Sequence, residues 1–133
     1  GGQRSRGYRY SGSYALDEIG WHAGNAKSDS WRTFGDKKEV GTKKPNEMGL
    51  YDMTGNVCEW CQDKLDTEYY HHSPSINPQG PDRSTYKDNR CFRGGSFCDE
   101  EKYDELKVYT RNTGMPPEEK YGHLGLRLAM SVN

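Results

Sequence analysis

The chain has 133 residues, the size of one ordinary domain. Lys and Arg total 19 and Asp and Glu total 20, so the net charge is −1; this balance argues against a nucleic-acid binder. No apolar run approaches the roughly 20 residues that cross a bilayer, and we expect no membrane span. Sixteen glycines and an aromatic content of 12% predict a small aromatic-rich core within much irregular backbone.

The predicted elements are short, and no stretch has the apolar spacing of a long amphipathic helix. In chain order, we expect a weak strand at 6–11, a helical turn at 14–20, a long surface loop at 64–89, a strand with a glycine pair at 91–97, a strand at 108–111 and a terminal strand at 125–129. This pattern indicates a loop-dominated α+β domain.

Two segments carry a recognisable pattern. Residues 45–60 read PNEMGLYDMTGNVCEW. Residues 92–97 read FRGGSF and are followed by GLRLA at 125–129. Together with NPQGP at 77–81, they resemble the formylglycine-generating enzyme (sulfatase-modifying factor) family. The family pattern is PNxxGLYDMxGNVWEW, then RGGSW, then GFRLA. The resemblance implies an α+β, C-type-lectin-like fold. It also identifies residues 1–133 as the C-terminal part of one such domain, so the missing N-terminal half is an expected partner.

The turn after Tyr51 contains candidate metal ligands. Asp52 and Glu59 flank a glycine turn, and a hard cation such as calcium combines carboxylates with backbone carbonyls. The resemblance implies calcium held by the side chains of Asp52 and Glu59 and by the carbonyls of Gly55 and Val57. The alternative is that the two carboxylates cap the turn and pair with arginines. A second, looser match places Asn25 with Asp29 in another calcium site.

Four cysteines are present at positions 58, 61, 91 and 98. Cys58 and Cys61 have the spacing of a redox or zinc pair, but no second such pair and no matching histidine spacing accompany them. The alternative is that the thiols are small buried side chains, with or without one disulfide.

The resemblance also bears on catalysis. The family's aerobic oxidases bind copper(I) through two cysteines shortly after RGGS, because thiolates select that metal. The matching positions here are Asp99 and Asp104, and Cys98 lies one position early. The family's iron-dependent branch needs histidines from an upstream region that this chain lacks. We therefore expect no copper and no catalytic residue.

The segment from 98 to 123 mixes tyrosines with charged and amide side chains, a composition suited to adaptable recognition. In part of the family, the variable proteins of diversity-generating retroelements, the corresponding segment is diversified. The candidate ligand contacts are Cys98, Asp99, Tyr103, Asp104, Tyr109, Arg111, Asn112, Tyr121 and His123. The alternative interpretation is a solvated charged face.

Three hypotheses follow. The favoured one is a binding domain that recognises a protein or glycan, at the cell surface or after secretion. The second is a sulfatase-modifying oxidase that converts a substrate cysteine to formylglycine, with Cys98 and another thiol holding copper. The third is a structural remnant that only packs against the missing N-terminal half.

Overall fold

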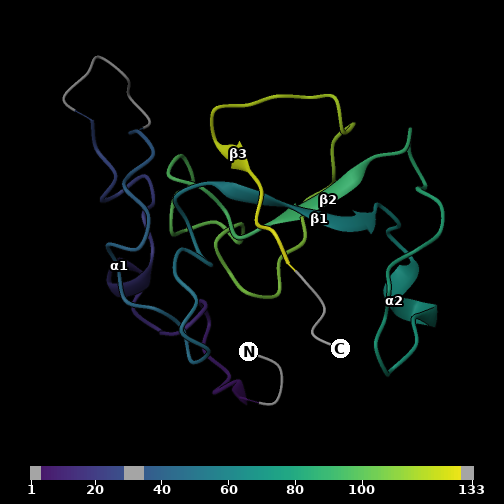
Figure 1. Ribbon diagram of the computed structural model, residues 1–133, viewed down its shortest axis with the longest axis horizontal. Helices are drawn as coiled ribbons and strands as arrows, with labels where there is room; N and C mark the ends of the chain where they lie inside the picture. The colour runs from purple at the N-terminus through teal and green to yellow at the C-terminus, as the bar shows by residue number, and fades with distance from the viewer. Residues whose placement is uncertain (1–3, 29–34, 130–133) are drawn as a thin grey trace.

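The computed structural model describes residues 4–28 and 35–129 (Figure 1). The elements within these ranges are short and are joined by long loops. In chain order they are α1 (Leu16–Ile19), β1 (Cys58–Lys64), α2 (Tyr69–His72), β2 (Arg90–Arg93) and β3 (Leu124–Gly125). Each helix is a single turn, and no described helix could cross a membrane.

The described strands form one sheet of order β2-β1-β3. β1 and β2 are antiparallel, with Trp60 opposite Phe92, and a bulge precedes the Lys64–Arg90 pair. β3 is parallel to β1 and pairs with it only at Cys58 and Glu59. Within the described residues, the β3 side of β1 beyond Glu59 therefore has no strand partner.

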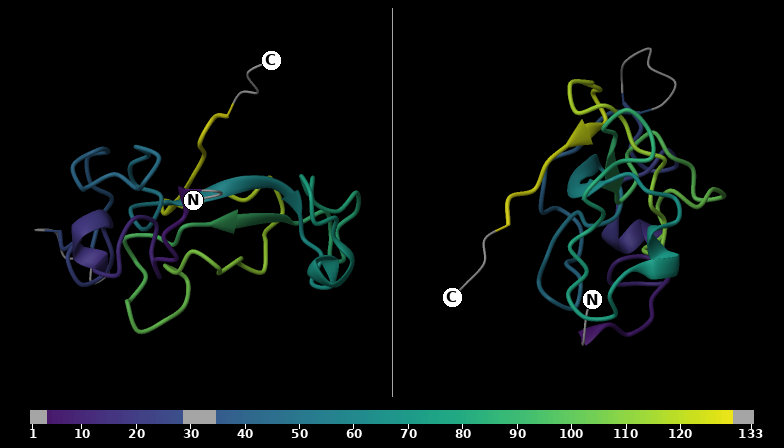
Figure 2. Two further views of the ribbon diagram at one scale, coloured as in Figure 1. Left: turned by 90° about the horizontal axis from the view of Figure 1, so that it is seen from below. Right: turned by 90° about the vertical axis from the view of Figure 1, so that its right-hand side faces the viewer.

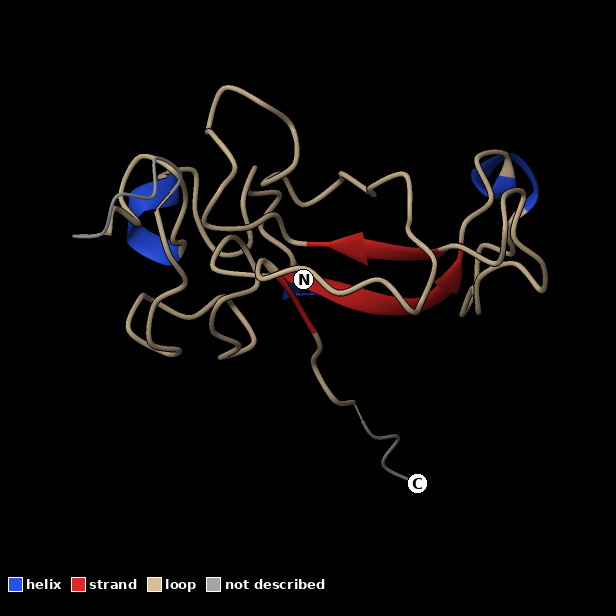
Figure 3. Ribbon diagram, turned by 90° about the horizontal axis from the view of Figure 1, so that it is seen from above, coloured by secondary structure: helices blue, strands red, loops and turns tan. Residues whose placement is uncertain are grey.

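The two helical turns lie at opposite ends of the sheet (Figures 1 and 3). Around α1, the buried side chains of Tyr10, Leu16, Ile19 and Leu106 form a hydrophobic cluster. Leu106 comes from the 98–123 segment, so this cluster joins the N-terminal part of the chain to the predicted binding segment. Burying these side chains together removes apolar surface from water and fixes both segments.

The turn at Gly55 and Asn56 is held by backbone hydrogen bonds to distant segments. The Gly55 N–H donates to the Gly94 carbonyl at 2.8 Å, and the Asn56 N–H donates to the Trp21 carbonyl at 2.7 Å. Gly55 has a φ of +75°, and a Cβ there would lie 2.3 Å from the Trp21 carbonyl oxygen. Only glycine therefore suits this position, both for its backbone conformation and for the close approach.

The structure confirms the helical turn at 14–20, which contains α1, and the strand before the glycine pair, which is β2. The pair then ends the strand, because Gly94 and Gly95 have φ values of +95° and +66°. A Cβ on Gly95 would approach the Leu106 side chain to 2.7 Å. The pair thus marks a turn with a close approach to the core cluster.

Several other expectations were wrong. Residues 108–111 form turns closed by hydrogen bonds such as Thr110 N–H to the Lys107 carbonyl. The 6–11 segment contributes only an isolated bridge from Tyr10 to Ser13, and the 64–89 loop contains α2. β1 was not predicted, because the cysteine spacing and the turn dominate the sequence pattern there. A strand needs a partner strand as well as an alternating pattern. Residues 108–111 have the alternating pattern but no partner strand among the described residues.

The predicted terminal strand at 125–129 is also wrong beyond Gly125. Residues 126–129 leave the body of the domain (Figure 2). The side chains of Leu126 and Leu128 are exposed, and Leu128 is 90% exposed. Arg127 alone turns back, towards Glu59. The alternation that predicted a strand is present, but no described segment pairs with it.

A pair of leucine substitutions tests this arrangement. We expect Leu106→Ala to lower the free energy of unfolding by about 2–5 kcal/mol, because it opens a cavity in the core cluster. Leu128→Ala should change it by less than about 0.5 kcal/mol, because that side chain is already in water. Urea denaturation of both variants measures the difference, and equal losses would contradict the described burial.

A pair of glycine substitutions tests the anchored turn. Gly7 has a φ of +71° and open space around it, so Gly7→Ala should cost only the roughly 1–2 kcal/mol of a left-handed alanine. Gly55→Ala should cost at least about 1 kcal/mol more, because its Cβ meets the Trp21 backbone. Equal unfolding free energies for the two variants would rule out the close approach.

Candidate functional site

The structure brings three of the four predicted calcium ligands to one cavity. Asp52, Val57 and Glu59 line a cavity of about 470 Å³ together with Arg127. The fourth, Gly55, does not line it and packs against the Trp21 backbone instead. Asp52 and Glu59 therefore lie at the same cavity, whereas Gly55 contacts the Trp21 backbone within the turn.

The two oxygens of Asp52 have different surroundings. Oδ2 accepts the Gly41 N–H at 2.7 Å. Oδ1 is buried and has no hydrogen-bond partner among the described residues. A buried carboxylate oxygen without a partner is costly, so this atom has capacity for one more hydrogen-bond donor or cation.

Glu59 is paired with Arg127. The Arg127 Nη2 lies 2.6 Å from Glu59 Oε1, and its Nε lies 2.9 Å from Oε2. The same Nη2 donates to the Tyr51 carbonyl at 2.9 Å. The hydrogen bond to Glu59 is the largest cause that raises the pKa of Arg127. The arginine pairing that the sequence left open as an alternative is therefore present for Glu59, in the bidentate form typical of strong pairs.

The looser calcium match at Asn25 finds less support. The Asn25 Oδ1 already accepts the His22 N–H at 2.9 Å, and its Nδ2 donates to Asp17 at 2.8 Å. Asp29 lies outside the described residues. The Asn25 amide thus ties α1 to the loop that follows it.

The four cysteines are free. Cys58 and Cys98 both lie near Ser96, whose Oγ accepts the Cys98 N–H at 3.2 Å. Burial, followed by the charge of Asp99, raises the pKa of Cys58 to about 12. The same two causes raise the pKa of Cys98. Both thiols are therefore weaker acids than an exposed cysteine.

Asp99 has a structural position at the RGGS turn. Its Oδ2 accepts the Ser96 N–H at 2.7 Å and the Ser96 hydroxyl at 3.1 Å. Its carbonyl accepts the Ala23 N–H at 3.0 Å. These bonds lock the turn to the N-terminal part of the chain, so Asp99 holds the scaffold and is less available to a ligand than the sequence suggested.

The remaining predicted contacts do not converge on one cavity. Cys98 lines a cavity of about 520 Å³ beside His22, on the α1 side. Tyr121 stacks on His123 with ring centroids 5.5 Å apart, and Tyr121 lines a smaller hollow beside Trp60. The predicted binding residues thus form an extended surface along the segment and not a closed pocket.

Between these ends, the loop carries exposed rings. Tyr103 and Tyr109 are exposed, and Lys102 lies over the Tyr103 ring at 4.9 Å. Asp104 is paired with Lys107. The Asn112 N–H donates to the Phe92 carbonyl at 3.3 Å, which holds this part of the segment against β2. Exposed tyrosines on a loop fixed by backbone hydrogen bonds offer contact area at low entropic cost.

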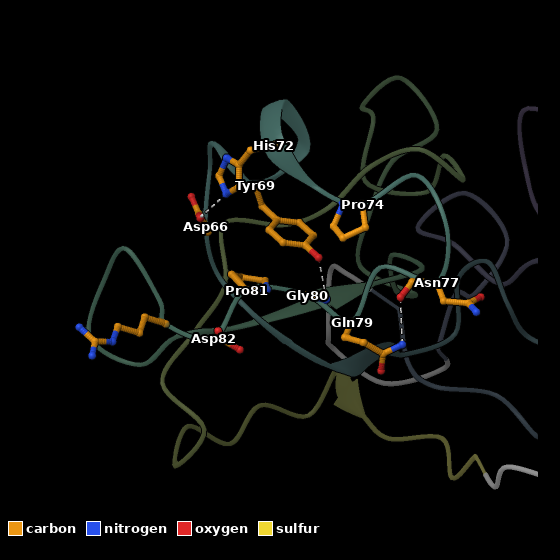
Figure 4. A pocket seen from close by; sticks show the side chains of 10 residues that line it. Asp66, Tyr69, His72, Pro74, Asn77, Gln79, Gly80, Pro81 and Asp82 are labelled. Atoms are coloured by element: carbon orange, nitrogen blue, oxygen red, sulfur yellow. Dashed lines mark hydrogen bonds and ion pairs between the residues drawn. The ribbon is translucent and has the colours of Figure 1, made fainter.

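The sequence analysis did not identify a cavity of about 540 Å³ between α2 and the NPQGP loop (Figure 4). The Tyr69 ring lies at its centre, and its hydroxyl accepts the Gly80 N–H at 3.1 Å. His72 reaches towards Asp66 at 3.9 Å on one side. The NPQGP motif was the available signal, but the low apolar content around it favoured a plain surface loop.

Comparison with known proteins finds related sequences. The chain is 36% identical over 91 residues to the formylglycine-generating enzyme of Streptomyces coelicolor, an alignment that covers 68% of this chain and 28% of that enzyme. This chain therefore matches less than a third of the length of that relative.

Solved structures are similar over nearly the whole chain. The Treponema denticola variable protein 1 has a TM-score of 0.66 and 27% identity, over 93% of this chain and 41% of that one. PvdO from Pseudomonas aeruginosa has a TM-score of 0.60 and 18% identity, over 90% of this chain and 41% of that one. The first likeness supports the predicted loop-rich, C-type-lectin-like α+β fold.

The family profile described as the sulfatase-modifying factor enzyme 1-like domain matches residues 1–132. This match includes the turn at 52–59, the RGGS turn and the segment between them. The chain therefore belongs to the sulfatase-modifying factor (formylglycine-generating enzyme) domain family.

Proposed function

We propose that this domain is a non-catalytic ligand-binding member of its family, which recognises a protein or glycan through the 98–123 surface. One observation carries the proposal. The tyrosine rings at 103, 109 and 121 are exposed on a segment whose scaffold residues, Leu106 and Asp99, are fixed. Large exposed rings on a rigid support are the typical composition of a recognition surface.

The contacts of each residue divide the predicted set. Asp99 and Cys98 belong to the scaffold of the RGGS turn, and Asp104 is engaged with Lys107. The proposed ligand contacts are therefore Tyr103, Tyr109, Arg111, Asn112, Tyr121 and His123. The likeness to a variable protein supports a retroelement-diversified surface, and a ligand at the cell surface or outside the cell suits that role.

The gene itself offers a test that needs no known ligand. Sister copies of this gene should differ at scattered positions between Phe97 and Gly125, with the exposed tyrosine positions among them. The scaffold positions Asp99 and Leu106 should stay constant, because they hold the turn and the core. Differences spread evenly over the chain would contradict a diversified binding surface.

The alternative is an oxidase that converts a substrate cysteine to formylglycine. A relative named formylglycine-generating enzyme supports it. Asp99 and Asp104 stand where the family pattern has its two copper cysteines, and burial raises the pKa of the Cys58 and Cys98 thiols. We therefore rank it second.

A copper(I) titration separates the two functions. Under anaerobic conditions with a competing chelator, we expect no stoichiometric copper(I) bound through Cys98, because it lacks a second thiolate partner at the family position. Cys98→Ser should behave like the parent chain, with Cys61→Ser as the matched control. One equivalent of copper(I) that is lost only in Cys98→Ser would favour the oxidase instead.

We also propose that calcium binds at the 52–59 turn. The unpartnered Asp52 Oδ1 and the carbonyl of Val57 would provide oxygen ligands, and Glu59 would be shared with Arg127. Calcium favours such mixed oxygen ligands. The ion would stabilise the turn and take no part in any reaction.

Thermal melting tests the calcium proposal. At 100 times the dissociation constant, calcium should stabilise the chain by about 2.7 kcal/mol relative to chelator. Asp52→Ala should remove this calcium-dependent difference, whereas Asp82→Ala, at an exposed carboxylate beside the other cavity, should keep it. Identical melting with calcium and with chelator would show that the turn needs no ion.

A further segment of the family domain is proposed as an intramolecular partner. The relatives are longer than this chain, and the β3 side of β1 beyond Glu59 has no strand partner among the described residues. Leu126 and Leu128, which follow β3, are exposed. A segment corresponding to the N-terminal half of the relatives would cover these leucines and complete the sheet.

A further inference from the structure

The Tyr70 side chain on α2 lies between two arginines from other parts of the chain. The Arg93 Nη2 donates to the Tyr70 hydroxyl at 2.6 Å. The guanidinium of Arg111 lies over the Tyr70 ring, 4.7 Å from its centroid. Tyr70 is itself 60% exposed, so the cluster opens to solvent. It combines α2, β2 and the 98–123 segment at one place.

The arginines are fixed by uncharged acceptors. The Arg93 Nη1 donates to the Thr110 carbonyl at 2.8 Å, and the Arg111 Nη2 donates to the Asp66 carbonyl. Within residues 4–28 and 35–129, neither guanidinium has a carboxylate within ion-pair distance. Two positive charges therefore stand together without an ion-paired carboxylate among the described residues, in contrast to Arg127, which is paired with Glu59.

The neighbouring carboxylates point to other groups. The Asp66 carboxylate accepts the Glu68 N–H at 2.9 Å and lies 3.9 Å from His72. The Asp63 carboxylate lies against Gly80. Burial raises the pKa of Cys91, the charge of Asp63 raises it further and both arginines lower it, so Asp63 lies in the same neighbourhood. Asp63 reduces the positive potential of the cluster but does not contact either guanidinium. The exposed side of Tyr70 leaves the cluster open to solvent.

We propose that the ligand recognised by this domain carries an anionic group, which Arg93 and Arg111 bind beside Tyr70. The inference rests on the proposed binding function and specifies the chemistry of its ligand. The planar guanidinium has five N–H donors arranged to meet two oxygens of a carboxylate, sulfate or phosphate. The tyrosine ring adds an apolar surface for the part of the ligand that carries the anion. The binding surface then extends beyond residues 98–123 to Arg93 and Tyr70.

Inorganic anions serve as probes of the cluster. Sodium sulfate, phosphate and acetate would be titrated at constant ionic strength against sodium chloride, while the Nε–H signals of the arginines are followed by NMR in the ¹⁵N-labelled chain. We expect saturable shifts of the Arg93 and Arg111 signals, and none of the Arg83 signal. Sulfate, phosphate and acetate in separate titrations distinguish a sulfated or phosphorylated ligand from a carboxylate-bearing one.

Matched variants complete the test. Arg111→Gln should weaken the anion response by roughly tenfold or more, because one of two charged partners is lost. Arg83→Gln, an exposed arginine beside another cavity, should leave it unchanged. If Arg111→Gln does not fold, Arg111→Lys keeps the charge without the planar fork and should still weaken the response.

The inference is overturned if no anion produces a saturable shift at Arg93 and Arg111, or if Arg83→Gln weakens the response as much as Arg111→Gln. The comparison of sister gene copies is independent of any anion. Clustered differences between those copies, together with a negative titration, would therefore keep the binding function and reject only the anionic ligand.

Discussion

Backbone hydrogen bonds at the turn of Gly55 and Asn56 are the constraint on which the rest of the domain depends. They join the turn to Trp21 on one side and to Gly94 on the other, and the Asn56 side chain also bonds to the backbone of Lys38 at 2.9 and 3.1 Å. Buried peptide groups need partners. In a chain with so little regular secondary structure, these contacts between segments provide partners that longer strands would otherwise supply. They also set where β1 begins, immediately after the turn.

The C-terminal and N-terminal parts of the chain are held to the domain by different kinds of contact. Towards the C-terminus, Arg127 binds Glu59 on β1, and that pair holds residues that otherwise leave the body of the domain. Towards the N-terminus, the cluster around α1 includes Leu106 and so fixes the 98–123 segment at that residue. One end is held by an ion pair and the other by apolar burial.

The arginines show how the same residue type acquires different roles through its surroundings. Arg127 forms an ion pair with Glu59 within the scaffold. Arg93 and Arg111 bond to neutral carbonyls and to a phenol, so their charge stays available at the surface. At the RGGS turn, the carboxylate of Asp99 is likewise used within the scaffold, where it accepts the Ser96 N–H. Together these features favour a domain that keeps the family scaffold and uses it for binding.

Sequence motifs alone were enough for the family, the glycine pair, the helical turn at 14–20 and the position of Asp52 and Glu59 at one cavity. These are local features, set by residues that are close along the chain or by a pattern that names a known scaffold. The tertiary structure decided the rest: that Leu106 is core while Tyr109 is surface, that residues 126–129 have no described strand partner, and that Tyr70 meets Arg93 and Arg111. Such outcomes depend on which distant segments pack together, and periodicity within one segment carries no information about that choice.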